Sequence, residues 1–206
     1  DPAPGYACFG GAGIGVRGVL AAWAPGAGAV LLPEGVGIDP GRGPLVIQIH
    51  YNTLTSDGRA DRTRVRLASA ASASTSVRIL PLADASLSLP PRQPLVSTSH
   101  EVGVASSPLV TRPFQVFGVY PHMHTLGRAL HAEVRHADGS TECLLDVPRW
   151  DFDWQLFYLR ERPLTIREDD TLVLRCDYDT TSRDETVRWG EGTADEMCLV
   201  GLLVDL

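Results

Sequence analysis

The stretch RPFQVFGVYPHMHTLG, residues 112–127, predicts a strand that leads directly into a pair of histidines. Residues 112–120 combine alternating apolar and polar positions with β-branched side chains, which is typical of a strand. His122 and His124 follow with Met123 between them, and side chains two positions apart on a strand point to the same face. Two imidazoles on one face suggest a metal ligand pair, whereas the competing interpretation is a polar strand edge.

The same kind of pattern recurs along the chain and predicts an all-β fold. No segment keeps a helical period over three turns. Turn clusters such as TSDGRADR (55–62), ADGS (137–140) and REDD (167–170) separate the predicted strands. Many short strands with regular turns indicate an antiparallel β-sandwich, jelly-roll-like in its second half. Besides residues 112–120, the predicted strands are 44–52, 62–69, 75–82, 129–136, 163–168 and 170–180, with a further apolar strand at the C-terminus.

The proline-rich stretch SLSLPPRQP, residues 86–94, suggests a joint between two units. Proline cannot donate to a strand ladder and stiffens the backbone. We therefore expect a partial β-sandwich domain over residues 1–85 and a complete sandwich over 86–206. The abrupt beginning DPAPGYACFGG suggests that a further segment or chain completes the first domain.

Composition excludes several classes of partner. The formal net charge of −7 argues against binding to a nucleic-acid backbone. No apolar run reaches about 18 residues, so no transmembrane segment is expected, and no signal peptide is recognisable. The four cysteines form no CxxC pair, which makes a zinc ribbon improbable. Cys176 and Cys198 lie in strand-like segments and could be cross-linked, or all four cysteines could be buried thiols.

A metal held by His122 and His124 needs a third ligand from elsewhere in the chain. On a strand, Met123 should point away from both histidines. Met197 is therefore the methionine that remains as a candidate third ligand. A thioether beside two imidazoles suits Cu(I) and disfavours magnesium and calcium. The alternative is a core methionine that fills a gap. His50, in QIHYN, is a second candidate ligand, although a single histidine makes no site, and His100, His131 and His136 are interpreted as surface or structural residues.

The motifs QIHYN, PHMHTLG, WQLFY, LRCDYDT and GEGTADEMC, in this order and spacing, resemble the copper type II ascorbate-dependent monooxygenases. CFGG and DRTRVRL resemble bacterial members, and the similarity runs from about residue 6 to the C-terminus. The family has two β-sandwich domains that each hold one copper. The resemblance implies that His122, His124 and Met197 form the oxygen-activating, catalytic copper site. It also implies that His50 is one ligand of the electron-transfer copper, in a first domain whose C-terminal part is residues 1–85.

Two further expectations follow from the resemblance. Cys176 and Cys198 match the disulfide that tethers the strand carrying the methionine ligand, and Cys8 would pair with an upstream partner. The electron-transfer copper also needs an adjacent His-His pair, which this sequence lacks. That pair either lies upstream or has been lost.

The sequence also departs from the family at its substrate-binding positions. In the peptide-hydroxylating members, an Arg, an Asn and a Tyr grip a substrate carboxylate, and the matching positions here are Tyr120, Leu199 and Gly201. Peptide amidation is therefore not expected, and a less polar substrate is. Asp195 and Glu196 beside Met197 could orient ligands or cap a turn, and the turn role is favoured. Within RWDFDWQLFY (149–158) we favour a core or interdomain role, with Gln155 or Tyr158 lining the substrate cleft as the alternative.

These features predict a copper-dependent monooxygenase that hydroxylates a C–H bond of a small organic substrate. It would use dioxygen as co-substrate, ascorbate as external reductant, and copper cycling between Cu(I) and Cu(II). The alternative is a copper-binding module without turnover, acting in copper storage, delivery or partner binding. The expected location is extracytoplasmic, either periplasmic or secreted, in a bacterium.

Overall fold

The structure is a computed structural model that describes residues 5–8, 11–15, 18–24, 26–51, 58, 60, 62–107, 110, 112–192 and 194–206. Within these residues the secondary structure is strands and one short 3₁₀ helix, η1, so the predicted all-β class is confirmed. The strands are β1 (Val36–Ile38), β2 (Thr75–Ala83), β3 (Ser88–Leu89), β4 (Val96–Gly103), β5 (Phe114–His122), β6 (Gly127–Arg135), β7 (Thr141–Val147), β8 (Tyr158–Ile166), β9 (Thr171–Tyr178), β10 (Val187–Arg188) and β11 (Leu199–Val204), and η1 is Val104–Ser106.

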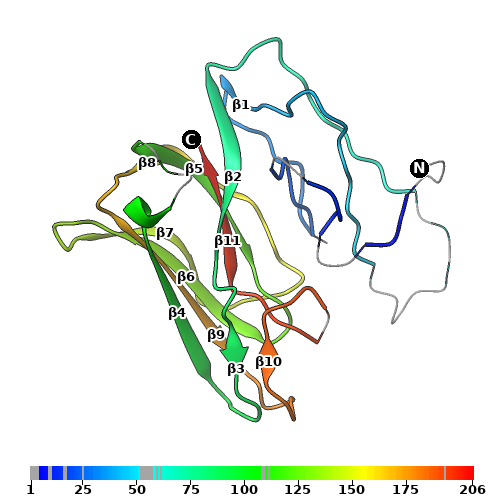
Figure 1. Cartoon of the computed structure of the whole chain (residues 1–206), viewed down its shortest axis with the longest axis vertical. Coiled ribbons are helices and arrows are strands. Elements are labelled where there is room, and N and C mark those ends of the chain that lie inside the picture. The colour runs from blue at the N-terminus through cyan, green and yellow to red at the C-terminus, as the bar shows by residue number, and fades with distance from the viewer. Residues whose placement is uncertain are drawn as a thin grey trace.

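Two sheets pack face to face as a β-sandwich (Figure 1). One sheet has the order β1-β2-β11-β5-β8, and the other has the order β4-β9-β6-β7. All pairings within the two sheets are antiparallel except β1 with β2. A short β3–β10 ribbon lies beside them. The predicted antiparallel sandwich is therefore present.

The main core fills the space between the two sheets. Its members alternate along the strands, as expected for residues that share one face of a pleated sheet. Leu82 on β2, Val119 on β5 and Leu202 on β11 face Leu130 on β6 and Leu174 on β9 across this core. Because the strands on both sides are fixed by this packing, the loops at their ends are held in defined positions.

A smaller apolar cluster lies on the outer face of the five-stranded sheet. Val77, Phe117 and Leu203 form its buried part. The N-terminal segment covers them with Leu32, Val36 and Ile38, which are partly buried. This contact docks the N-terminal segment against the outer face of the sheet, as Figure 1 shows for the blue ribbon beside β2.

Most of the predicted strands after residue 74 are confirmed. The predictions for 75–82, 112–120, 129–136 and 170–180 correspond to β2, β5, β6 and β9, and the C-terminal strand corresponds to β11. The strand predicted at 163–168 begins earlier, as β8, which contains Pro163. Proline is tolerated there because β8 is an edge strand. Strands β4 and β7 were missed.

Two predictions in the N-terminal half are wrong. Residues 44–51 and 62–69 form no strand, although they alternate as strands do. Their apolar side chains face solvent: Ile47 is 60% exposed and Leu67 is 58% exposed. Alternation of this kind marks a strand when one face is buried, and the apolar side chains of these two segments stay largely exposed. The predicted turn at 55–62 lies largely outside the described residues.

The division near residue 86 remains a proposal. Strand β2 precedes that position and is hydrogen-bonded to β11 along its length, so it belongs with the second unit. The joint itself contains β3, which pairs with β10. None of the helices among the described residues is long and apolar enough to cross a membrane.

The sandwich contains the disulfide that the resemblance implied. Cys176 on β9 is bonded to Cys198, which immediately precedes β11, and both are fully buried. Their Cα atoms are 6.0 Å apart, inside the usual range of about 4.4–6.8 Å. Cys8 and Cys143 are exposed free thiols, so the cross-link is confirmed and the alternative of four buried thiols is excluded.

Candidate metal centre

The two histidines of the opening motif lie where β5 ends. His122 is the last residue of the strand, and His124 lies two residues beyond it. Their ring centroids are 5.2 Å apart and the rings are nearly perpendicular, at 79°. Met123 between them is fully buried in the main core, as predicted. The alternation of the strand thus carries past its end, and the two imidazoles stand next to each other.

Gln155 fixes the orientation of the His122 ring. Its side-chain nitrogen donates to the Phe152 carbonyl at 2.7 Å, which leaves its oxygen facing Nδ1 of His122, also at 2.7 Å. Because an amide oxygen can only accept, Nδ1 must carry the proton. The lone pair on Nε2 of His122 is therefore available to a ligand.

His124 is held in the same tautomer by the backbone. Its Nδ1 lies 2.9 Å from the carbonyl oxygen of Asp195, which accepts the Nδ1 proton and frees Nε2. Trp150 donates its indole N–H to the carbonyl oxygen of His124 at 3.1 Å. Phe152 meets the ring edge-on, with centroids 6.4 Å apart. Both histidines thus present an unprotonated Nε2.

The electrostatics of His122 favour the neutral ring. Burial lowers the pKa of His122, and the charges of His124 and His50 lower it further. The hydrogen bond to Gln155 and the charge of Glu191 act in the opposite direction. Since metals bind neutral imidazole, a depressed pKa extends the pH range in which the ring can act as a ligand.

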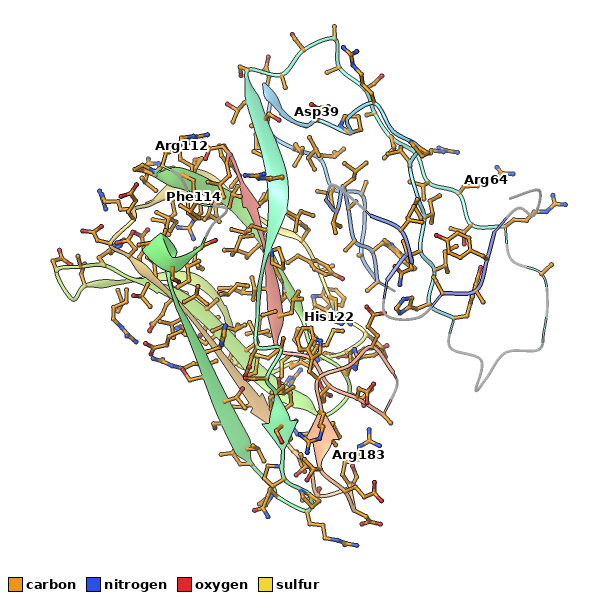
Figure 2. All side chains as sticks on the ribbon, in the orientation of Figure 1. Asp39, Arg64, Arg112, Phe114, His122 and Arg183 are labelled. Carbon is orange, nitrogen blue, oxygen red and sulfur yellow. A yellow bond between two sulfur atoms is a disulfide. The ribbon has the colours of Figure 1, made fainter. Side chains whose placement is uncertain are left out.

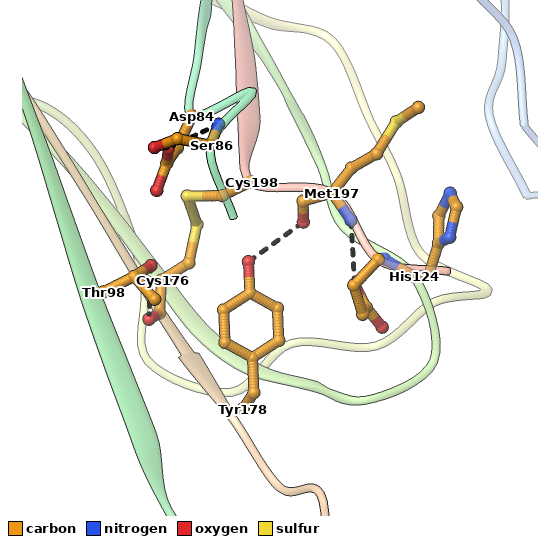
Figure 3. The surroundings of a disulfide bond; sticks show 9 residues. Asp84, Ser86, Thr98, His124, Cys176, Tyr178, Met197 and Cys198 are labelled. Atoms are coloured by element: carbon orange, nitrogen blue, oxygen red, sulfur yellow. Dashed lines mark hydrogen bonds between the residues drawn. A yellow bond between two sulfur atoms is a disulfide. The ribbon is translucent and has the colours of Figure 1, made fainter. Parts of the chain in front are cut away.

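Met197, the methionine considered as a third ligand, belongs to the segment before β11. It lies directly before Cys198 and is 9% exposed. The Tyr178 hydroxyl, buried beneath it, donates to its carbonyl oxygen at 3.0 Å (Figure 3). In Figure 3 the Met197 side chain extends to the side on which the His124 ring lies. Burial raises the pKa of Tyr178, which keeps this donor protonated.

Glu196 joins the histidine loop to the Met197 segment. Its side chain is fully buried. Oε2 accepts the backbone N–H of His124 at 2.8 Å and of Met197 at 3.1 Å, and Oε1 accepts the N–H of Leu126 at 2.7 Å. Burial raises the pKa of Glu196, and the three N–H donors oppose that effect.

The neighbouring carboxylate has the turn role that the sequence suggested. Asp195 accepts the N–H of Gly192 at 3.0 Å. Glu196, in contrast, supports the site, which from the sequence was only the less favoured alternative, and the contact of Gln155 with His122 was not predicted. The only available signal was that each lies next to a functional or aromatic motif, because their partners are distant in sequence.

His50 lies outside this group. Its Nε2 is 2.7 Å from Nε2 of Gln48 and 3.7 Å from Oε2 of Glu191, and its side chain is 57% exposed. Within the described part of the chain, no three His, Cys, Asp or Glu side chains gather as metal ligands.

The register of β11 places the expected substrate positions beside the histidines. Leu199 is opposite His122, and Gly201 is opposite Tyr120. Tyr120 is buried and stacks on Phe157, with ring centroids 6.2 Å apart. Figure 2 shows His122 on the side of the sandwich that faces the N-terminal segment. The outer face next to His122 is thus apolar and aromatic.

Comparison with known proteins relates this arrangement to one family. Residues 77–203 match the family described as "Copper type II ascorbate-dependent monooxygenase, C-terminal domain". "DBH-like monooxygenase protein 1" of Gallus gallus is 30% identical over an alignment of 212 positions, which covers 90% of this chain and 32% of that protein. "Dopamine beta-hydroxylase" of Bos taurus is 28% identical over an alignment of 195 positions, which covers 89% of this chain and 32% of that protein.

A third relative aligns with a shorter part of this chain. "Putative DBH-like monooxygenase protein 2" of Homo sapiens is 36% identical over 91 residues, or 43% of this chain and 18% of that protein. The chain spans about a third of the length of the first two relatives. All three relatives are animal proteins, so they give no support to the expectation of a bacterial type.

Proposed function

Because the chain belongs to the copper type II ascorbate-dependent monooxygenase family, we propose that its sandwich holds copper on His122, His124 and Met197. The observation that carries the proposal is the shared tautomer of the two histidines. Each donates its Nδ1 proton to an internal acceptor and leaves Nε2 free. Two such nitrogens and one buried thioether are a donor set that suits Cu(I).

Copper bound there would supply the redox chemistry by which dioxygen hydroxylates a C–H bond of the substrate. The protein supplies orientation and the exclusion of water. Gln155 and the Asp195 carbonyl hold the two rings, and the Tyr178 hydroxyl holds the backbone of Met197. The family description names ascorbate, and we propose it as the external reductant.

We propose a small substrate. The part of it that contacts β5 and β11 carries no carboxylate. The three positions that would grip a carboxylate are Tyr120, Leu199 and Gly201, and none carries a positive charge. The stacked rings of Tyr120 and Phe157 offer an apolar surface beside His122. The buried Cys176–Cys198 disulfide supports an extracytoplasmic location, periplasmic or secreted.

A second candidate function is a copper-binding module without turnover. It would follow if the full-length gene product has no His-His pair, because His50 alone leaves the electron-transfer copper incomplete. If such a pair lies in another segment of the gene product, His50 would be the third ligand of that copper.

The test measures bound copper and ascorbate-dependent oxygen uptake on the full-length gene product. Two coppers per chain with uptake supports the monooxygenase, and one copper without uptake supports the binding module. Met197→Leu conserves volume and removes the thioether, so it should abolish uptake in a folded protein. Met123→Leu is the matched control, because Met123 is also buried but lies in the main core, and it should retain uptake. Full uptake by Met197→Leu would contradict the ligand assignment.

A further inference from the structure

Glu196 is a carboxylate that lies beside the candidate site and is removed from solvent. It is fully buried, and its carboxylate is placed between two segments that lie 70 to 72 residues apart in sequence. One segment carries His124 and the other carries Met197. Burying an ionised carboxylate costs several kcal/mol unless hydrogen bonds compensate, so a side chain kept there needs a compensating role.

The bonding pattern is that of an ionised carboxylate. Both oxygens accept backbone N–H groups, and neither faces an acceptor in these three contacts. Bonds to a charged acceptor are about twice as strong as neutral ones. One side chain therefore fixes the backbone on both sides of His124 and the backbone of Met197 itself.

We infer that Glu196 is a positioning residue that sets the separation between the His124 imidazole and the Met197 thioether, and with it the affinity and geometry of the copper site. This inference rests on the proposed function. The disulfide and the Tyr178 hydroxyl also anchor the Met197 strand, but both do so toward β9. The β11–β5 ladder also joins the two regions up to Leu199, opposite His122. Beyond the ladder, Glu196 and the bond from His124 Nδ1 to the Asp195 carbonyl tie the Met197 segment to the histidine loop.

Glu196→Gln is the sharpest perturbation, because glutamine has the same shape with only one acceptor oxygen. If that oxygen takes the bonds from His124 and Met197, the amide nitrogen faces the N–H of Leu126. In the other orientation, the nitrogen faces two N–H donors. Either orientation sets a donor against a donor, so the loop must move on one side of His124.

A matched control exists at the other end of β9. Asp170 is also a buried carboxylate, and it accepts the N–H of Arg167 at 2.7 Å. Asp170→Asn should therefore destabilise the fold in the same way as Glu196→Gln. It should leave the copper site unchanged, because Asp170 precedes the first residue of β9 whereas Tyr178 beneath Met197 is the last.

Three readouts separate positioning from simple folding support. They are amide hydrogen exchange of the metal-free protein, Cu(I) affinity by chelator competition, and the stretching frequency of carbon monoxide added to the Cu(I) protein. In Glu196→Gln we expect exchange at Leu126 or His124 to accelerate at least about tenfold, with one of these amides unpaired. We expect Cu(I) affinity to fall by about 10- to 100-fold, as for other residues that orient ligands. The carbon monoxide band should shift or broaden.

Wild-type affinity and an unchanged band in Glu196→Gln would overturn the inference. If Glu196→Gln does not fold, Glu196→Asp replaces it, since it keeps both oxygens but is one methylene shorter. The aspartate variant should show an intermediate loss of affinity, and wild-type affinity would again overturn the inference. If wild-type protein binds no Cu(I), the proposed function fails. The inference then depends on exchange alone, and unchanged exchange at Leu126 and His124 overturns it.

Discussion

Replacing both disulfide cysteines, as Cys176→Ala/Cys198→Ala, should cost the sandwich a large part of its stability. The bond closes a loop with a sequence separation of 22. The loss of chain entropy in the unfolded state for a loop of this size stabilises the native state by about 3 kcal/mol. Both sulfurs are fully buried, and deleting two groups of methylene size adds about 0.8 kcal/mol each. The expected total is roughly 4–5 kcal/mol.

The assay is urea unfolding followed by circular dichroism, with wild type and variant under identical conditions. Because the bond restrains the unfolded chain, the slope of free energy against urea should rise in the variant. The free energy of unfolding must therefore be extrapolated with each protein's own slope. Cys143→Ala is the control, because that thiol is free and exposed, and its change should stay within about 0.5 kcal/mol.

The Cys176→Ala/Cys198→Ala variant should keep most of its Cu(I) affinity although it loses much of its free energy of unfolding. Cys198 adjoins Met197, but the Tyr178 hydroxyl and the Glu196 carboxylate still hold the Met197 backbone when the disulfide is absent. The double variant should thus lose less Cu(I) affinity than Met197→Leu. A loss of stability below about 1 kcal/mol would refute the reasoning, because loop closure alone predicts three times that value.

Three other predictions concern the ligand support, the pH response and the core. Gln155→Leu leaves the Nδ1 proton of His122 without its acceptor and should lower Cu(I) affinity about 10- to 100-fold in chelator competition; unchanged affinity would mean that this bond does not orient the ring. The hydrogen bond with Asp170 raises the pKa of His136 in the folded protein. The stability that this pair gives the fold is therefore complete below the unfolded-state pKa of about 6.5, and it is lost as the pH rises through the folded-state pKa. Relative to His136→Gln, wild type should lose unfolding free energy as the pH rises above about 6.5, and parallel urea profiles would contradict this. Leu202→Ala, in the centre of β11, should cost about 2–5 kcal/mol without changing the stoichiometry of copper, measured by metal analysis of the folded variant.

The sequence predicted strands where one face is buried. In β5, β6 and β9 the inward positions are apolar, so the alternation is visible without the structure. Strand β4 was missed because its sequence, VSTSHEVG, has few large apolar residues and lies at the edge of its sheet. Residues 44–51 show the opposite error, since their alternation is clear but the apolar side chains of the segment stay largely exposed.

The candidate site was predictable only in part. The spacing of His122 and His124 is local, and a strand of any sequence would bring their rings together. The support of these rings is not local: Gln155 lies 33 residues from His122, and Glu196 lies 72 residues from His124. Pairing over such separations depends on how the two sheets stack, which single-sequence patterns do not encode. The role of Met197 came from the resemblance to a family rather than from its surroundings.

The most direct test of the central claim is copper K-edge X-ray absorption of the Cu(I)-loaded protein. We expect two imidazole nitrogens and one sulfur scatterer around the copper of the wild type. The sulfur signal should vanish in Met197→Leu and persist in Met123→Leu. A wild-type spectrum without sulfur, or a sulfur signal that survives in Met197→Leu, would contradict the assignment of His122, His124 and Met197 as the ligands.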